Sequence, residues 1–204
     1  MNTHCDILIG PIGAHEARAP ARHLPGDLAI WFFILAELLA FGVFFLAYAF
    51  SRANNMELFA AGQLALDRDA GAINTVLLLT SSYFVVRAVQ AAEANAGRFA
   101  ARWLAGAFAC GAGFVVVKGF EYADKFAHGV SLSSSTFDMF YLLLTFFHFM
   151  HVILGLVILA ALWRGARAGR YGPGRLNGME TGAAYWHMVD LVWLILFPLV
   201  YLMR

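Results

Sequence analysis

Charged residues are scarce in this sequence. Asp, Glu, Lys and Arg make up only 13% of its 204 residues, while 61% are hydrophobic and 19 are Phe. A soluble domain is about a quarter charged and about half apolar. The shortage of charge therefore argues against a soluble globular protein, and the sequence predicts an integral membrane protein.

Cysteines, long basic runs and a signal peptide are also missing. Cys5 and Cys110 are too few for a disulfide framework. A net charge of +1, with no long basic run, gives no indication of nucleic acid as a partner. The only apolar stretch before Leu28 covers residues 7–9, which is too short for a signal peptide. We expect residues 1–27 to form a polar cytoplasmic tail.

Apolar runs of membrane-spanning length occupy most of the remaining chain. A helix needs about 20 apolar residues to cross the hydrocarbon core of a bilayer. Five runs reach this length, at 28–50, 71–93, 99–121, 137–162 and 181–203. Short polar connections separate them, at 51–70, 94–98, 122–136 and 163–180. Because an isolated strand cannot satisfy its backbone in lipid, we predict an all-α polytopic membrane bundle of five transmembrane helices, with residues 28–204 as one domain.

Arginines are concentrated on one side of the predicted membrane. The tail and the regions around the second and fourth connections carry Arg18, Arg22, Arg98, Arg102, Arg164, Arg167, Arg170 and Arg175. The other side has only Arg52, Arg68, Lys125 and Arg204. Since short cytoplasmic loops carry the excess of Lys and Arg, we expect a cytoplasmic N-terminus and a periplasmic C-terminus.

The third predicted helix, 99–121, is rich in small residues between Ala105 and Gly113. Small residues let helices approach one another closely in lipid, so we expect the other helices to surround this one. Its far end carries Lys118 and Glu121, which we place at the outer boundary of the membrane. We expect Lys118 to extend toward the interface and to form ion pairs locally.

Five ionisable residues interrupt the apolar runs: Glu37, His148, His151, His187 and Asp190. Residues three apart share a helix face, which pairs His148 with His151 and His187 with Asp190. A rise of about 1.5 Å per residue places these groups at similar depths in the membrane. Ionisable groups there are costly and normally face a protein interior or a wet cavity. We therefore expect a buried polar layer.

Three interpretations of this polar layer are open. Histidines with a carboxylate can form a metal site, although a spacing of three on a long helix is a weak indication of one. Glu37 and the histidines could instead serve a proton relay or a small proton-coupled transporter, although no broken-helix pair or inverted repeat is visible. Alternatively, the groups pair with one another or with neighbouring hydroxyls and amides to fix helix packing, which we favour.

Five stretches, taken in order, resemble subunit III of the haem-copper respiratory oxidases. They are Trp31–Glu37 before a Phe-rich run, the Asn-Thr, leucine and Ser-Ser run Asn74–Ser82, the pair Glu121-Tyr122, the His-x-x-His-Val helix His148–Val152 with Gly155, and the Trp-His-x-x-Asp-x-x-Trp run within Tyr185–Trp193. Each match alone is modest evidence. Together they cover about residues 25–203, and their order makes the resemblance specific.

The resemblance implies a non-catalytic accessory subunit that supports assembly, stability or proton uptake of a respiratory complex in the bacterial inner membrane. It implies no haem or copper on this chain. The implied partners are membrane lipid and a catalytic, multi-helix subunit carrying haem, with copper or non-haem iron. Longer family members have two further helices at the start, and this short five-helix form looks most like the branch associated with nitric oxide reductase. Glu37, His148, His151, His187 and Asp190 would set the packing of the bundle.

Overall fold

The computed structural model describes residues 28–203, and the elements found there are all helices. They are α1 (Leu28–Asn54), α2 (Met56–Leu64), α3 (Arg68–Glu93), α4 (Gly97–Ala127), α5 (Thr136–Arg167), α6 (Asn177–Phe197) and the π-helix η1 (Pro198–Leu202). The predicted cytoplasmic tail, 1–27, lies outside the described residues.

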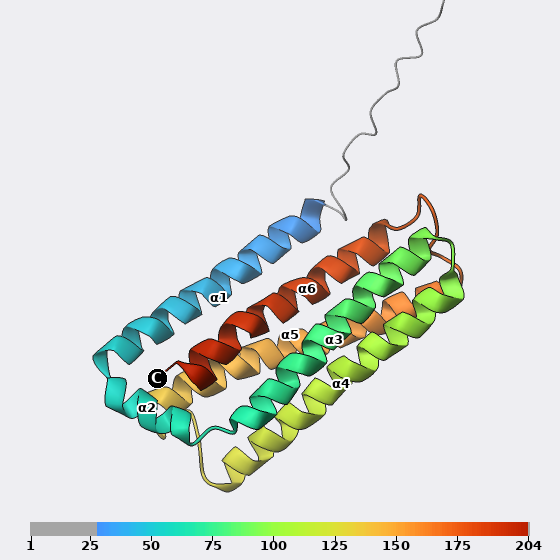
Figure 1. Ribbon diagram of the computed structural model, residues 1–204. Helices are drawn as coiled ribbons and strands as arrows, with labels where there is room; N and C mark the ends of the chain where they lie inside the picture. Colours follow the sequence, from blue (N-terminus) through green and yellow to red (C-terminus); the bar gives the residue numbers. More distant parts are fainter. Residues whose placement is uncertain (1–27, 204) are drawn as a thin grey trace, which may run out of the picture.

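The five long helices form an elongated bundle (Figure 1). Five spans of the described chain are long and apolar enough to cross a membrane, α6 being counted together with η1. The all-α, five-span fold class is therefore confirmed. Helices α1, α4 and α6 run in one direction and α3 and α5 in the other (Figure 1). Which end faces the cytoplasm stays a prediction from the arginines.

The structure adds a short helix that the sequence reading missed. Residues 51–70 were expected to form a polar connection, but they contain α2, which lies across one end of the bundle (Figure 1). Phe59 and Gln63 of α2 are buried. The Gln63 amide donates to the Tyr48 hydroxyl and to the Leu199 carbonyl, both at 3.3 Å. We call this the α2 end of the bundle.

The long helices extend beyond the predicted apolar runs at most of their ends. Polar residues do not interrupt a helix when it leaves the hydrocarbon, and side chains there can cap it. The Asp67 carboxylate accepts hydrogen bonds from two backbone amides at the start of α3, and the Ser135 hydroxyl accepts one at the start of α5. Helix α4 continues to Ala127, so Glu121 lies inside a helix and not at its end.

The central helix of the bundle is α6. In its span 56% of the most apolar stretch is buried, against 33% for α4 and 11% for α1. Helix α6 packs against α1, α3 and α5, whereas α4 packs mainly against α3 and α5. The expectation that the other helices surround 99–121 is therefore wrong. Its small residues admit large side chains from its neighbours; for example, Phe84 lies against Gly106.

The indole of Trp186 joins three helices at the bundle centre. This side chain on α6 is 1% exposed. A Cβ atom added at Gly111 of α4 would lie 2.7 Å from the indole, and one added at Gly155 of α5 would lie equally close. The absence of side chains at these two glycines therefore makes the space that the tryptophan fills, which brings α4, α5 and α6 together.

Pro198 changes the helix type at the end of the chain. A proline has no N–H to donate, so it removes one hydrogen bond from a helix. The α-helical pattern stops at Phe197 and five π-helical residues follow. The hydrogen bond from Gln63 to the Leu199 carbonyl shows that α2 supports this turn.

The packing of Trp186 makes a prediction about Gly155. The substitution Gly155→Ala should lower the free energy of unfolding by about 1–3 kcal/mol, because the new methyl group overpacks the core. Gly42→Ala is the matched control, since a Cβ there meets nothing within 4 Å. Unfolding in mild detergent measures both. Equal stability of the two variants would contradict this account of the tryptophan.

Candidate functional site

The most extensive polar cluster of the described residues surrounds Lys118 in the half of the bundle nearer α2. The Lys118 amino group lies 3.0 Å from Glu121 Oε1. It also donates to the Tyr141 hydroxyl at 3.2 Å and to the Tyr201 hydroxyl at 2.5 Å. Both tyrosine hydroxyls donate to the same Glu121 oxygen, at 2.5 and 2.7 Å. We call these four residues the Lys118 network, and it connects α4, α5 and η1.

Burial of the Lys118 network corrects the expectation made for this lysine. Its side chain is 0% exposed and that of Glu121 is 6% exposed, so Lys118 does not extend to the interface. The rings of Tyr122, Tyr141, Tyr201 and Trp193 lie 4.9–5.8 Å from the amino group. Aromatic faces attract a cation most strongly where water is absent. The expected local ion pair is present, but it lies inside the bundle.

Glu37 and His151 form a second ionic contact, between α1 and α5. His151 Nε2 lies 3.0 Å from Glu37 Oε2, and His151 Nδ1 lies 2.7 Å from the Phe147 carbonyl oxygen. Since a carbonyl oxygen can only accept, Nδ1 carries a hydrogen. The contact between Nε2 and Oε2 links α1 to α5 within the membrane span.

His148 lies in the interior of the bundle. Its side chain is 0% exposed, and its ring stacks on that of Trp193 with centroids 5.2 Å apart. The ring of Phe114 lies at 5.7 Å. Aromatic rings lie against both histidines of α5, but only His151 also contacts a carboxylate. Neither ring nitrogen of His148 has a hydrogen-bond partner among the described residues.

His187 and Asp190 interact with α3 through Ser82. The Ser82 hydroxyl lies 3.1 Å from His187 Nδ1. Asp190 is 7% exposed and interacts electrostatically with both Ser82 and His187. Ser82 belongs to the polar stretch of α3 whose pattern resembled subunit III. Nearby, the Trp193 indole donates to the Thr75 hydroxyl at 3.0 Å, which also links α6 with α3.

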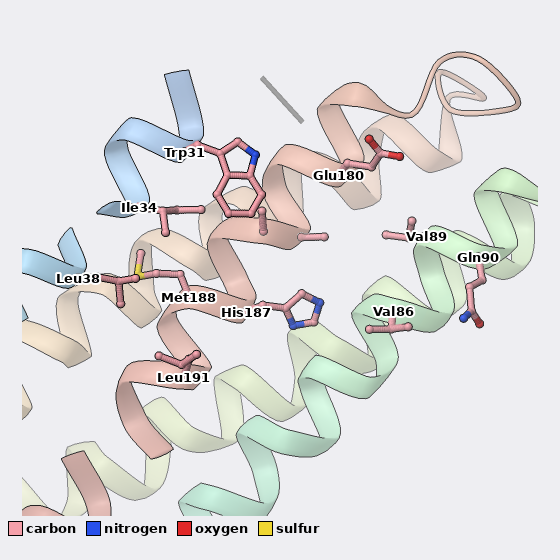
Figure 2. A pocket seen from close by; sticks show the side chains of 12 residues that line it. Trp31, Ile34, Leu38, Val86, Val89, Gln90, Glu180, His187, Met188 and Leu191 are labelled. Carbon is pink, nitrogen blue, oxygen red and sulfur yellow. The ribbon is translucent and has the colours of Figure 1, made fainter. Parts of the chain in front are cut away.

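A groove of about 560 Å³ separates α1 from α3 over the surface of α6. Its lining is mostly apolar, with Ile34 and Leu38 on the α1 side and Val86 and Val89 on the α3 side. Figure 2 shows the His187 imidazole pointing across this space toward α3, with the Trp31 indole above it. The groove can accommodate an apolar chain, and its lining offers few polar groups to orient a reacting substrate.

The five ionisable residues that were expected to form one buried polar layer lie at three separate sites. The structure brings Glu37 together with His151, and His187 together with Asp190, but His148 lies among aromatic rings. Within residues 28–203, no three side chains of His, Cys, Asp or Glu come together as a metal site requires.

Sequence reasoning missed the partners of these groups. Gln63, Tyr48, Tyr141 and Tyr201 each make a buried hydrogen bond or lie in the Lys118 network. Their chemical types gave little indication, because a tyrosine in an apolar run reads as an ordinary packing residue. The spacing of three between Lys118 and Glu121 was the one local sign of the network.

Comparison with known proteins identifies a family. The family model for cytochrome c oxidase subunit III matches residues 22–204. The chain is 31% identical over 177 residues to cytochrome c oxidase subunit 3 of Thermostichus vulcanus, with 86% of each chain covered. It is 32% identical over 172 residues to the protein of the same name from Synechocystis sp., covering 84% of this chain and 72% of that one.

A longer relative contains a second subunit in the same polypeptide. The heme-copper oxidase subunit I+III of Aeropyrum pernix is 31% identical over 183 residues, which cover 85% of this chain and 22% of that protein. The matching region is therefore joined to other sequence in that polypeptide.

The Lys118 network predicts a large effect of removing its cation. Lys118→Met should lower the free energy of unfolding by about 3–5 kcal/mol, because Glu121 is left buried without its ion-pair partner. Adding Glu121→Gln should recover part of this loss. The matched control is Lys125→Met on the same helix. Lys125 is half-buried and donates to the Ala65 carbonyl at 2.7 Å, so a loss of about 1 kcal/mol is expected there. Unfolding in detergent measures the free energy of unfolding of each variant. Similar losses for the Lys118 and Lys125 variants would refute a structural role of the network.

Proposed function

Because the chain belongs to the cytochrome c oxidase subunit III family, we propose that it serves as a non-catalytic accessory subunit of a respiratory haem-copper oxidase. In this role it supports the assembly, stability or proton uptake of the catalytic subunit. The resemblance found in the motifs of the sequence is thereby confirmed at the level of the family. The chain is a multi-pass membrane protein, and we propose that its membrane is the inner membrane of a bacterium.

The observation that best supports an accessory role is where the polar side chains lie. The Lys118 network, the Glu37–His151 pair and the Ser82–His187 contact each join two or more helices of the bundle. Groups arranged in this way hold helices together and specify their contacts. We propose that Glu37, His148, His151, His187 and Asp190 act in this packing role and do not carry out a reaction.

The partner proposed for this chain is the catalytic subunit of the same complex. The fused Aeropyrum pernix protein supports this choice, because its printed name joins subunits I and III in one polypeptide. The haem would then lie on the partner, together with copper in an oxidase or non-haem iron in a nitric oxide reductase. The first two relatives above are named cytochrome c oxidase subunit 3, so we propose that the complex is an oxidase. Membership of the branch associated with nitric oxide reductase stays a prediction from the sequence.

Purification in mild detergent tests the proposed function. A tagged chain expressed in its native host should bring down a multi-helix protein with a haem spectrum, because the accessory subunit binds the catalytic one. The same chain purified alone should show no haem absorbance. Metal analysis of the complex then separates copper from non-haem iron. Stoichiometric haem on the isolated chain would contradict the proposal.

Glu37 provides a second test. We expect Glu37→Gln to leave the complex intact, since glutamine is nearly isosteric with a protonated glutamate and can still hydrogen-bond His151. The measurement is the yield of haem protein co-purified with the variant and with the wild type. Loss of the complex would show that the carboxylate charge is itself structural.

A further inference from the structure

We propose that the face of α1 beside Glu37 and His151 is a docking surface for a transmembrane helix of the haem-bearing partner. The identity of that partner rests on the proposed function. The surface itself is inferred from the packing of α1 and from the polar pair beside it.

Helix α1 is the least embedded of the five spans. Only 11% of its most apolar stretch is buried, and its contacts are with α6 and, to a lesser extent, with α2 and α5. The groove beneath Trp31 separates it from α3 on one side. Large apolar side chains at helical spacing cover its outer face, including Phe32, Leu35 and Leu39, which are 61–70% exposed. Most of α1 is therefore available to another chain.

The Glu37–His151 pair distinguishes one side of α1 from the rest. The Glu37 side chain is 20% exposed and that of His151 is 11% exposed. Glu37 is nine residues into α1, which corresponds to about 14 Å of helix at 1.5 Å per residue, so this exposure lies within the hydrocarbon. Ionisable groups at that depth normally face protein or water and not lipid. A polar side chain on a partner helix would meet this requirement; a lipid chain would not.

Small side chains next to Glu37 allow such a helix to come close. Ala40 lies three residues after Glu37, on a neighbouring position of the helix surface. Ala36 lies four residues before Ala40 and Ala47 lies seven residues after it, so the three alanines share one face. Ala36 and Ala47 are exposed and Ala40 is half-buried. Small residues are enriched where transmembrane helices pack, because they let the backbones approach. The partner is thus an apolar helix that carries a hydrogen-bonding side chain at the depth of Glu37.

Photocross-linking within the intact complex tests this surface. A photoreactive amino acid replaces Ala40 or, as the matched control, Ala109 of α4. Each alanine lies twelve residues after the first residue of its helix, so their depths are similar, and Ala109 is also exposed. We expect Ala40 to cross-link the haem-bearing chain strongly and Ala109 to give little of this product.

Cross-links to that chain from Ala109 but not from Ala40 would overturn the proposal, as would cross-links from Ala40 to lipid alone in an intact complex. If the wild-type chain brings down no haem protein, the proposed function fails independently of the surface. Cross-links from Ala40 only to lipid, or only to a protein without haem, would overturn the docking proposal.

Substitution of Glu37 tests the polar part of the surface. Glu37→Leu should weaken association with the haem-bearing chain by about threefold to twentyfold, the range expected for one hydrogen bond between membrane helices. Glu37→Gln, which keeps hydrogen-bonding capacity, should remain near wild type. Melting of each isolated variant checks that the bundle is still folded. Equal association of folded Leu and Gln variants would refute a polar contact at Glu37.

Discussion

A bilayer interior offers no hydrogen bonds, and this constraint governs the arrangement of the described chain. A charged side chain at membrane depth is stabilised only where protein or water supplies a partner. Lys118 is the strongest case, because its amino group is fully buried and contacts Glu121, Tyr141 and Tyr201. The network ties the last turn of the chain to α4 and α5. Removing the cation would leave the Glu121 carboxylate buried without its ion-pair partner. That loss is strongly destabilising even where the intact pair adds little net stability.

The remaining packing centres on α6. Its tryptophans occupy two different positions: Trp186 fills the space left by Gly111 and Gly155, and Trp193 stacks on His148 while donating to Thr75. Large side chains on the central helix thus face small ones on its neighbours. This complementarity supplies the close contacts that hold helices together in lipid, where the hydrophobic effect between helices is absent. Helix α1 takes little part in it.

The weak attachment of α1 relates the fold to the proposed role. An accessory subunit needs a rigid body that folds by its own contacts and a surface that another subunit completes. The helices α3 to α6 form such a body, held by the Lys118 network and by the contacts of Ser82 with His187 and of Trp193 with Thr75. The Glu37–His151 pair, in contrast, lies at the edge of the bundle and stays partly exposed. A partner that covers the Glu37–His151 pair would also hold α1 in place.

The sequence by itself determined the membrane class, the five spans, the family and the pairing of Lys118 with Glu121, because hydropathy, segment length and short spacings are local properties. It did not determine which helix is central, and the small residues of 99–121 suggested the wrong one. It also missed α2. It did not show that His148 and His151 have different contacts, and it placed Lys118 at the interface although this lysine is buried. Only the tertiary structure decided these points, because Gln63, Tyr141 and Tyr201 reach their partners from distant segments, and no periodicity in the sequence records which helices become neighbours.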